Sequence, residues 1–539
     1  MFFFASDNIL SPSMLTQIKA IKAAGYQQDT NVLLHFDPNE KGAPTRVFEV
    51  NRAESQAGGP SRIGDSNHLV SVLTSDDITS TTFRGAKADI DAMESKVALE
   101  KFLDTCREDY PADHYMLFLV GHGMVVGRDS FLPDENPVSA IGLVDLGKIL
   151  NTFKDNTAGK LELIGMHSCS MSGVEISYQL QDTASFMLGS QGVSFLGAWP
   201  YRQMLITIYN AIEAERKNPA QPVSVVDLLE HLHDLSIQHS ADFMVGGYSA
   251  DLCLSTLNSK NVANLDKPIQ DLAQSLTKGL KHPRCLELIL LAHWKSQSYW
   301  QETYTDLYDF CLCLRELCLQ QNGNRPAQAP PGRPQRVYDE TQRQIEEACA
   351  TIMQILKPKR PTAADGPVVR ADFIGPATQY SHGLSIYFPW SEPVQDKNEK
   401  ALENYAAYEF SSRPLTKGWL IFLRSYFQET QRSGRVEEDR DIKGQDASYQ
   451  TPDFMHALDD AQQAFKVPGT AAGQPQSVPT ALDGGKVIPP DSGGGGACAC
   501  LSIKNYSPEF VMSSNASKVF GSAGGPSAKA AGAAVKQQP

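Results

Sequence analysis

Short apolar runs alternate with stretches of helical periodicity through the first half of the chain. The runs that predict strands are 1–5, 31–36, 46–50, 115–120, 161–166, 186–190 and 255–257. Apolar residues at helical spacing predict helices over 14–24, 86–106, 143–153, 173–181, from 201 through 208, and over 223–239. Continuous apolar strands joined by helices indicate a parallel sheet that is covered on both faces. We therefore predict an α/β fold for residues 1–265.

The pattern changes after residue 265. Residues 266–357 are mainly helical with a Pro/Gly-rich interruption at 322–336, strand character returns over 368–390, and a last amphipathic helix runs through 419–426. We expect 266–433 to complete the first unit or pack on it. The tail, 434–539, is rich in Gly, Ala, Ser and Pro and has few aromatics, so it cannot bury enough apolar surface to fold alone. The tail is therefore predicted to be largely disordered, and the polar stretch 52–85 is predicted to be a surface insertion.

Length, charge and cysteine content limit the kinds of partner and the cellular location that we expect for this protein. With 539 residues, the chain is too long for one typical core. A net charge of −14 argues against nucleic acid or an anionic membrane surface as the main partner. Ten cysteines are too sparse for a disulfide framework. The short apolar start lacks a basic region, and no stretch reaches the ~20 apolar residues of a membrane span. We expect a cytoplasmic protein without a membrane or nucleic-acid partner.

Two reactive residues directly follow neighbouring predicted strands. His122 lies between two glycines after the strand 115–120, and Cys169 lies between two serines after the strand 161–166. Carboxyl ends of parallel strands meet at one sheet edge, and 46 intervening residues suffice for a helical crossover. A neutral histidine can take the thiol proton and later protonate a leaving amine. The residues alone equally allow a buried structural thiol and a loop histidine.

The arrangement of strand, His-Gly, helix, strand and cysteine resembles the caspase-like cysteine peptidases, and it resembles the clostripain family more closely. The matching segments, in order, are Ser6-Asp7-Asn8, Pro111-Ala112-Asp113-His114-Tyr115, Gly121-His122-Gly123, Ser168-Cys169-Ser170-Met171 with Val174-Glu175, Trp199-Pro200-Tyr201, and His382-Gly383-Leu384-Ser385-Ile386-Tyr387-Phe388-Pro389. The resemblance covers roughly residues 1–430.

The resemblance implies a caspase-type three-layer α/β/α sandwich and a peptidase mechanism. Cys169 would form an acyl-enzyme, His122 would be the acid/base, and the N–H groups of Gly123 and Cys169 would hold the oxyanion. The substrate would be a polypeptide. The expected substrate-binding residues are His167, Ser168, Ser190 and Trp199. No cofactor or metal is expected. Calcium is implied only by its use in some relatives, since no EF-hand pattern is present.

His167 departs from the family pattern. Clostripain-like enzymes usually carry Asp at this position, where it helps to accept Arg or Lys at the cleaved bond. An imidazole is a poor partner for a guanidinium, so basic specificity would need another acid. Asp129, Glu135 and Glu175 are the candidates in sequence, with Glu175 the more typical of a structural or surface residue. Open alternatives are a pocket for neutral or acidic side chains, a degenerate protein that binds peptides or partners, and acyl transfer to an amine.

Two further expectations concern segments outside the dyad. Many family members are precursors cut in the loop after the histidine, and the loop 124–142, with Arg128, Asp129, Asp134 and Glu135, could be cut or could stay an intact surface loop. His231, His233 and His239 share one predicted helix, but the first two do not share a face, so a metal site there is not expected.

Overall fold

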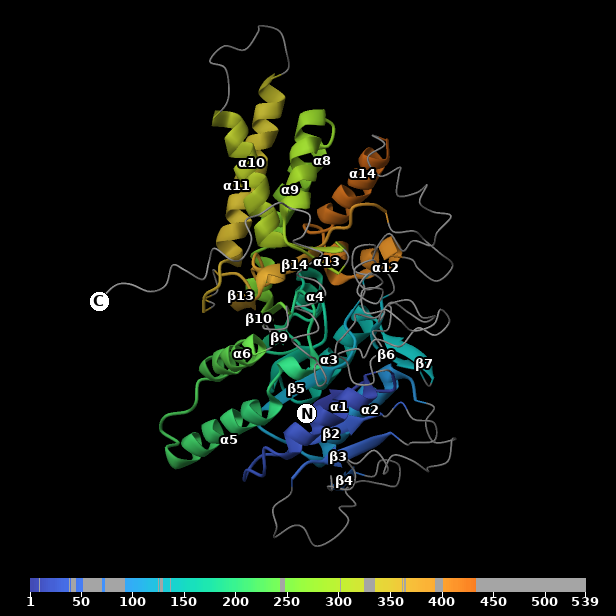
Figure 1. Cartoon of the computed structure of the whole chain (residues 1–539), viewed down its shortest axis with the longest axis vertical. Helices are drawn as coiled ribbons and strands as arrows, with labels where there is room; N and C mark the ends of the chain where they lie inside the picture. Colours follow the sequence, from blue (N-terminus) through green and yellow to red (C-terminus); the bar gives the residue numbers. More distant parts are fainter. Residues whose placement is uncertain are drawn as a thin grey trace, which may run out of the picture.

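The computed structural model describes residues 1–432 except 9, 38, 40–44, 52–69, 73–92, 125, 127–128, 136, 243–247, 301, 324–334, 361, 363–364 and 393–400. Within this part of the chain a nine-stranded sheet has the order β13-β10-β9-β8-β5-β1-β2-β3-β4 and forms the middle of the molecule (Figure 1). Its strands are β1 (Phe2–Phe4), β2 (Leu33–Phe36), β3 (Arg46–Glu49), β4 (Val70–Val72), β5 (Tyr115–Val120), β8 (Leu161–His167), β9 (Phe186–Gly189), β10 (Ala250–Thr256) and β13 (Val368–Ile374).

The central strands of this sheet are parallel. β2, β1, β5, β8 and β9 pair parallel in that order, while β3, β10 and β13 join antiparallel to their inner neighbours. These central strands are almost entirely buried, which explains why they read as continuous apolar runs. The predicted mainly parallel sheet is confirmed.

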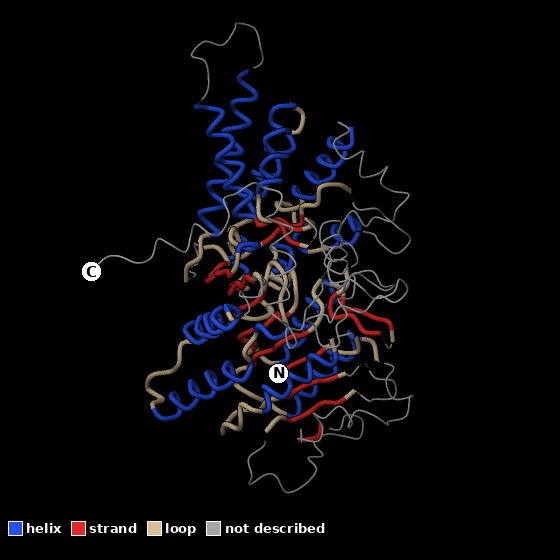
Figure 2. Tube along the Cα trace, in the orientation of Figure 1, coloured by secondary structure: helices blue, strands red, loops and turns tan. Residues whose placement is uncertain are grey.

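Helices cover both faces of the sheet, which gives the predicted three-layer α/β/α sandwich (Figures 1 and 2). One face packs on α1 (Ser11–Lys22), η3 (Leu196–Ala198), α5 (Tyr201–Lys217) and α6 (Val225–Ala241). The other face packs on α2 (Ser95–Asp109), α3 (Leu143–Asn156) and α4 (Val174–Gln179). Each layer buries its own apolar cluster, so the sheet separates two cores.

The later part of the chain adds a helical layer and a small second sheet. Its helices are α7 (Ser259–Ala263), α8 (Asp266–Gly279), α9 (Pro283–Lys295), α10 (Leu307–Gly323), α11 (Gln335–Leu356), η5 (Pro376–Thr378), α12 (Ala401–Ala407), α13 (Glu409–Ser412) and α14 (Gly418–Arg432). A three-stranded sheet is formed by β11 (Ser298–Tyr299), β12 (Tyr304–Asp306) and β14 (Ser385–Tyr387). β13 comes from the same part of the chain and extends the main sheet, and one apolar core continues across both parts. We call residues 266–432 the C-terminal region.

The structure differs from the sequence pattern at β10 and in the segment 124–142. β10 starts at Ala250, five residues before the predicted strand at 255. The prediction missed this start because Asp251 interrupts the apolar character of the strand. The segment 124–142 contains a hairpin of β6 (Phe131–Glu135) and β7 (Val138–Ile141), with Phe131 fully buried. Most of the predicted insertion 52–85 and the predicted disordered tail 434–539 lie outside the described residues, although β4 falls inside the insertion. Among the helices of the described part, none has the length and apolar character to cross a membrane.

Candidate active site

β5 and β8 deliver His122 and Cys169 to the same edge of the sheet. The parallel register pairs Val120 with His167, the last residues of the two strands. Just beyond, the Gly121 N–H donates to the His167 carbonyl at 3.3 Å. Residues 121–123 and 167–169 therefore run side by side, and both expected catalytic residues leave adjacent strand ends. His122 is buried, with 6% of its surface exposed, and Cys169 is fully buried.

The backbones of Gly123 and Cys169 are in direct contact. A Cβ atom at position 123 would lie 1.8 Å from the Cys169 carbonyl oxygen and 2.7 Å from the Cys169 nitrogen. No side chain fits in that space, so the approach requires glycine. The two segments expected to supply oxyanion-binding N–H groups are thus adjacent in space.

The Cys169 thiol lies against the turn that follows β9. The backbone N–H of Ser194 donates to Cys169 Sγ at 3.4 Å, and the Ser194 carbonyl lies 3.9 Å from the same sulfur. Ser190, one of the expected substrate-binding residues, is buried in this turn and its carbonyl accepts the Ser172 N–H at 2.9 Å. An N–H aimed at sulfur favours the thiolate, which is the nucleophilic form.

His167 is a buried, neutral, hydrogen-bonded side chain. Its Nε2 donates to the Phe195 carbonyl at 2.9 Å, which leaves Nδ1 to accept from the Tyr201 hydroxyl at 2.7 Å. The ring stacks on Trp199 with centroids 4.7 Å apart. Burial lowers the pKa of His167 to about 4, so the ring is uncharged at neutral pH. His167 therefore joins β8 to the segment before α5 and supplies no charge to the site.

The remaining expected substrate-binding residues are also below the surface. Trp199 is 2% exposed and stacks on His167, and Ser168 is fully buried. A small cavity of about 10 Å³ lies beside Trp199, lined by Ser190, Val193, Ser194, Phe195, Ala198, Trp199, Ser236, Ile237, Ser240, Ala250, Asp251 and Leu252. Apart from Asp251, its lining is uncharged.

The three acids considered for a basic pocket have other contacts. Asp129 accepts the Leu143 N–H at 2.9 Å at the start of α3, and it also accepts the Tyr408 hydroxyl at 2.8 Å. Glu175 accepts the Tyr387 N–H at 3.0 Å and the Tyr405 hydroxyl at 2.7 Å; its burial raises its pKa. The Glu135 carboxylate accepts from Asn39 on the exposed side of the β6–β7 hairpin. Glu175 is structural, as the sequence suggested.

A group of buried residues near Cys169 was not predicted from the sequence. Asp251 accepts the Gln191 N–H at 2.6 Å and the Gly192 N–H at 2.9 Å. The Gln191 side chain donates to Asp306 at 2.9 Å and accepts the Gly383 N–H at 2.8 Å. These contacts join β10, the turn after β9 and the C-terminal region, which sequence spacing cannot relate. The one available signal was a polar Asp next to an apolar strand.

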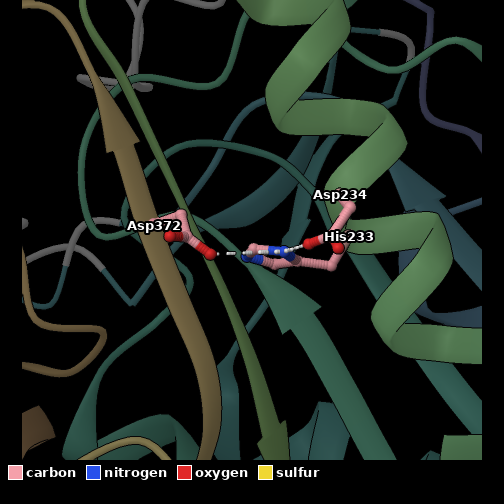
Figure 3. A group of neighbouring side chains, drawn as sticks. All are labelled: His233, Asp234 and Asp372. Carbon is pink, nitrogen blue, oxygen red and sulfur yellow. Dashed lines mark hydrogen bonds and ion pairs between the residues drawn. The ribbon is translucent and has the colours of Figure 1, made fainter. Parts of the chain in front are cut away.

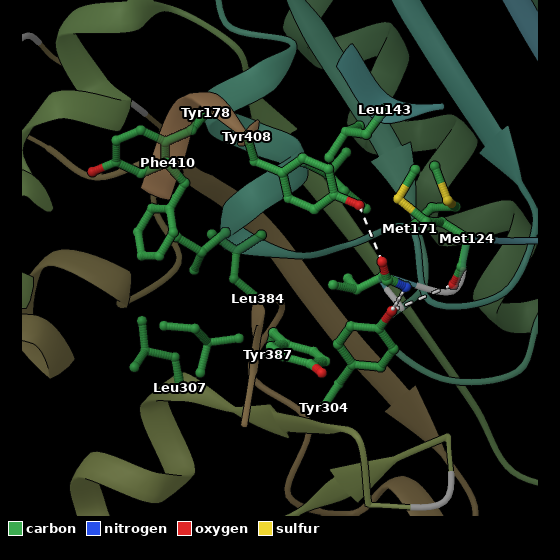
Figure 4. Packing of buried hydrophobic residues seen from close by; sticks show 14 of the residues in the cluster. Met124, Leu143, Met171, Tyr178, Tyr304, Leu307, Leu384, Tyr387, Tyr408 and Phe410 are labelled. Carbon is green, nitrogen blue, oxygen red and sulfur yellow. Dashed lines mark hydrogen bonds between the residues drawn. The ribbon is translucent and has the colours of Figure 1, made fainter. Parts of the chain in front are cut away.

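The segment directly after Gly123 is also held by the C-terminal region (Figure 4). The Val126 N–H donates to the Tyr304 hydroxyl at 3.0 Å, and the Tyr408 hydroxyl lies 3.4 Å from the Val126 carbonyl. Figure 4 shows Tyr304, from β12, and Tyr408, from the junction between α12 and α13, reaching this segment. Both segments that flank the candidate dyad therefore contact residues beyond 300.

Among the described residues, two clusters of side chains have the composition of a metal site. His233 lies with Asp234 and Asp372 (Figure 3). Arg370 binds both of those carboxylates at 3.0 Å, and His233 Nε2 donates to the Leu252 carbonyl at 3.1 Å, so this group forms an ion network between α6 and β13. The second group is Asp7, Asp37 and Asp134, all buried, with carboxylate oxygens within 4.8 Å of one another. Its oxygen-only donor set fits a hard cation such as calcium.

The sequence model of the clostripain family matches residues 2–354. This chain belongs to the clostripain family of cysteine peptidases. Clostripain of Hathewaya histolytica is 22% identical over 363 residues, which cover 58% of this chain and 64% of the relative. The chain thus spans less than two thirds of the length of that curated relative.

The chain is also similar to two solved structures. One is an inactive zymogen C11 protease from Parabacteroides distasonis, with TM-score 0.45 and 15% identity, covering 76% of this chain and 96% of the other. The second is a secreted C11 cysteine protease from Bacteroides thetaiotaomicron in complex with an irreversible peptide inhibitor. It has TM-score 0.45 and 14% identity, and the match covers 76% of this chain and 97% of the other.

Proposed function

We propose that this chain is a cysteine endopeptidase that cleaves polypeptides through an acyl-enzyme on Cys169. The observation that carries the proposal is the contact between Gly123 and Cys169 at the adjoining ends of β5 and β8, which brings the histidine and cysteine segments together. Family membership supports the same chemistry. The inhibitor complex of the Bacteroides thetaiotaomicron relative supports a peptide as the substrate class.

The reaction follows from the roles that each group can take. His122 removes the Cys169 proton, and the thiolate attacks the carbonyl carbon of the scissile bond. The N–H groups of Gly123 and Cys169 stabilise the oxyanion. The protonated His122 then gives its proton to the leaving amine, and it later activates the water that hydrolyses the thioester.

We further propose that the primary pocket accepts an uncharged side chain. His167 is neutral and hydrogen-bonded at the position where relatives usually carry Asp, and the acids Asp129 and Glu175 are engaged elsewhere. The cavity beside Trp199 has an otherwise uncharged lining, and the Asp251 carboxylate is directed to the backbone of the turn. Peptides that differ only at the cleaved residue should show faster hydrolysis after neutral residues. A preference for Arg or Lys would overturn this specificity.

A second function is favoured by one observation, the complete burial of Cys169. A degenerate site could bind a peptide or partner without cleaving it. A set of peptides that carry a thiol-reactive group separates the two functions, with Arg, Lys, Asp and neutral residues at the reactive end. The peptidase predicts labelling of Cys169 that is absent in Cys169→Ala, whereas absence of labelling by every peptide would favour the binding function.

We propose that a cut in the segment 124–142, made by the protein itself, opens access to Cys169 and activates the site. The described part forms the β6–β7 hairpin, whose Val138 is 90% exposed, while Arg128 lies outside the described residues. Incubation of the wild-type chain and Cys169→Ala, followed by mass spectrometry, tests self-cleavage. A cut in the wild type alone supports it, and an uncut active enzyme contradicts it.

Calcium remains a proposal based on the family. Asp7, Asp37 and Asp134 would hold the ion, which would supply charge compensation between β1, β2 and the hairpin. The readout is thermal stability with calcium and with a chelator, for the wild type and Asp134→Asn. A calcium-dependent rise in melting temperature that the variant lacks would support the site, and equal behaviour would exclude it.

A further inference from the structure

The turn at residues 190–194 is bonded to the residues around the candidate nucleophile at three points. The Ser172 N–H donates to the Ser190 carbonyl at 2.9 Å, and the Ser170 N–H donates to the Gly192 carbonyl at 3.0 Å. The Ser194 N–H donates to Cys169 Sγ at 3.4 Å. The position of this turn therefore determines whether an N–H group faces the sulfur.

A side chain of β10 holds the turn from the opposite side. The antiparallel register pairs Cys253 with Gly189 at the end of β9, and continuing it places Asp251 opposite Gln191. Beyond Gly189 the Asp251 carboxylate bonds the backbone of the turn. One of its oxygens accepts the Gln191 N–H at 2.6 Å, and the other accepts the Gly192 N–H at 2.9 Å. Asp251 is 3% exposed, so water does not compete for these bonds.

Glycine at position 192 permits this approach. A Cβ atom there would lie 2.9 Å from Asp251 Oδ1 and 3.1 Å from the Tyr299 ring. The first distance is shorter than real Cβ contacts and the second is tighter than most, so the turn or these two side chains must move. Residue 192 therefore provides a way to disturb the contact between the turn and Asp251 while the carboxylate keeps its charge.

We propose that Asp251 is a positioning residue for Cys169. It fixes the turn 190–194 so that the Ser194 N–H points at the sulfur and stabilises the thiolate. This role rests on the proposed function, in which the thiolate is the nucleophile. Asp251 itself takes no part in the bond changes and acts through the backbone of the turn.

The negative charge of Asp251 disfavours the Cys169 thiolate, whereas its hold on the turn favours it. The direction in which the thiolate fraction changes therefore tells the two effects apart. Burial raises the pKa of Asp251 to about 7, and the negative charges of Asp251 and Cys169 disfavour each other. If Asp251 acted only through its charge, its neutralisation would favour the thiolate. If it acts by holding the turn, the same change disfavours the thiolate.

The test is Asp251→Asn in the full chain, with thiolate formation followed across pH by its ultraviolet absorbance relative to the same chain carrying Cys169→Ala. The asparagine keeps the shape but offers only one acceptor to two N–H groups. We expect the thiolate fraction at neutral pH to be about tenfold smaller. This is the size of effect expected when the thiolate loses one charge-assisted hydrogen bond, from the Ser194 N–H. A thiolate fraction that rises or stays unchanged would overturn the proposal.

Two further variants complete the test. Gly192→Ala disturbs the contact between the turn and Asp251 with the Asp251 charge intact, and it should also lower the thiolate fraction. It serves as the test if Asp251→Asn does not fold, and an unchanged fraction would count against the proposal. Asp365→Asn is the matched control, since Asp365 also accepts a backbone N–H, from Thr362 at 2.8 Å, before β13. It should leave the Cys169 titration unchanged. The titration of Cys169 needs no substrate. If the variants shift this titration as expected but the protein cleaves no peptide, the proposed function is overturned and the role of Asp251 is not.

Discussion

The sheet edge at β5 and β8 and the C-terminal region contribute to the candidate site in different ways. The edge supplies His122 and Cys169 from neighbouring strands in a short span of sequence. The C-terminal region supplies none of the proposed reacting groups, but Tyr304 holds the segment after Gly123, and Asp306 binds the Gln191 side chain in the turn against Cys169. The comparison teaches that the proposed reacting groups are local in sequence, whereas the contacts that fix their surroundings come from residues far along the chain.

The largest effect is expected from Gly123→Ala, which breaks the sheet edge itself. The new Cβ would lie 1.8 Å from the Cys169 carbonyl oxygen, so one of the two backbones must move. We expect loss of peptidase activity by at least ~100-fold, comparable with the loss of an oxyanion donor. The measurement is kcat/KM on a cleaved peptide.

Gly418→Ala is the matched control for that change. Its added Cβ would meet only the Ala273 side chain at 3.5 Å, an ordinary contact at the start of α14. Near wild-type kcat/KM is expected. Full activity in Gly123→Ala would show that the contact between the strand ends is not needed.

Gln191→Ala breaks the link between the turn and the C-terminal region. It removes a donor to Asp306 at 2.9 Å and leaves the buried Gly383 N–H without its 2.8 Å acceptor. We expect the free energy of unfolding to fall by ~2–4 kcal/mol, measured by denaturant titration. Gln344→Ala on α11 is the control and should change it by less than ~0.5 kcal/mol. Equal stability of the two variants would show that the link is energetically unimportant.

The smallest effect concerns the pH dependence contributed by His167. Its pKa falls from 6.5 to about 4 on burial, so below pH 6.5 the unfolded chain binds a proton that the folded chain does not. Its contribution is complete above pH 6.5 and is lost as the pH falls toward 4, by up to ~1.4 kcal/mol per pH unit.

His167→Gln should remove that part of the slope. Burial lowers the pKa of His35 and His293 to about 3 in the same direction, and their contributions stay in both proteins, so the difference between the two curves reports His167. Denaturant titrations between pH 4.5 and 6.5, a range chosen from these shifts, give the slopes. Identical slopes would mean that His167 is not buried and neutral in solution.

The sequence predicted the parts of the site that lie on regular strands. Apolar runs located β5 and β8, and the spacing between His122 and Cys169 predicted their shared edge. Hydrogen bonds between distant segments leave no periodic signal, so Asp251 could not be linked to the turn after β9. The same limit applies to His167, whose residue type raised the question of specificity while its bonding to Tyr201 became evident only in the fold.

The central claim is that Cys169 and His122 hydrolyse peptide bonds. A peptide-library digest read by mass spectrometry tests it directly, with the wild-type chain, Cys169→Ala and His122→Ala in parallel. The account predicts cleavage by the wild type, none by Cys169→Ala, and cleavage reduced by at least ~100-fold in His122→Ala. Absence of cleavage by the wild type after any residue, or equal cleavage by Cys169→Ala, would contradict it.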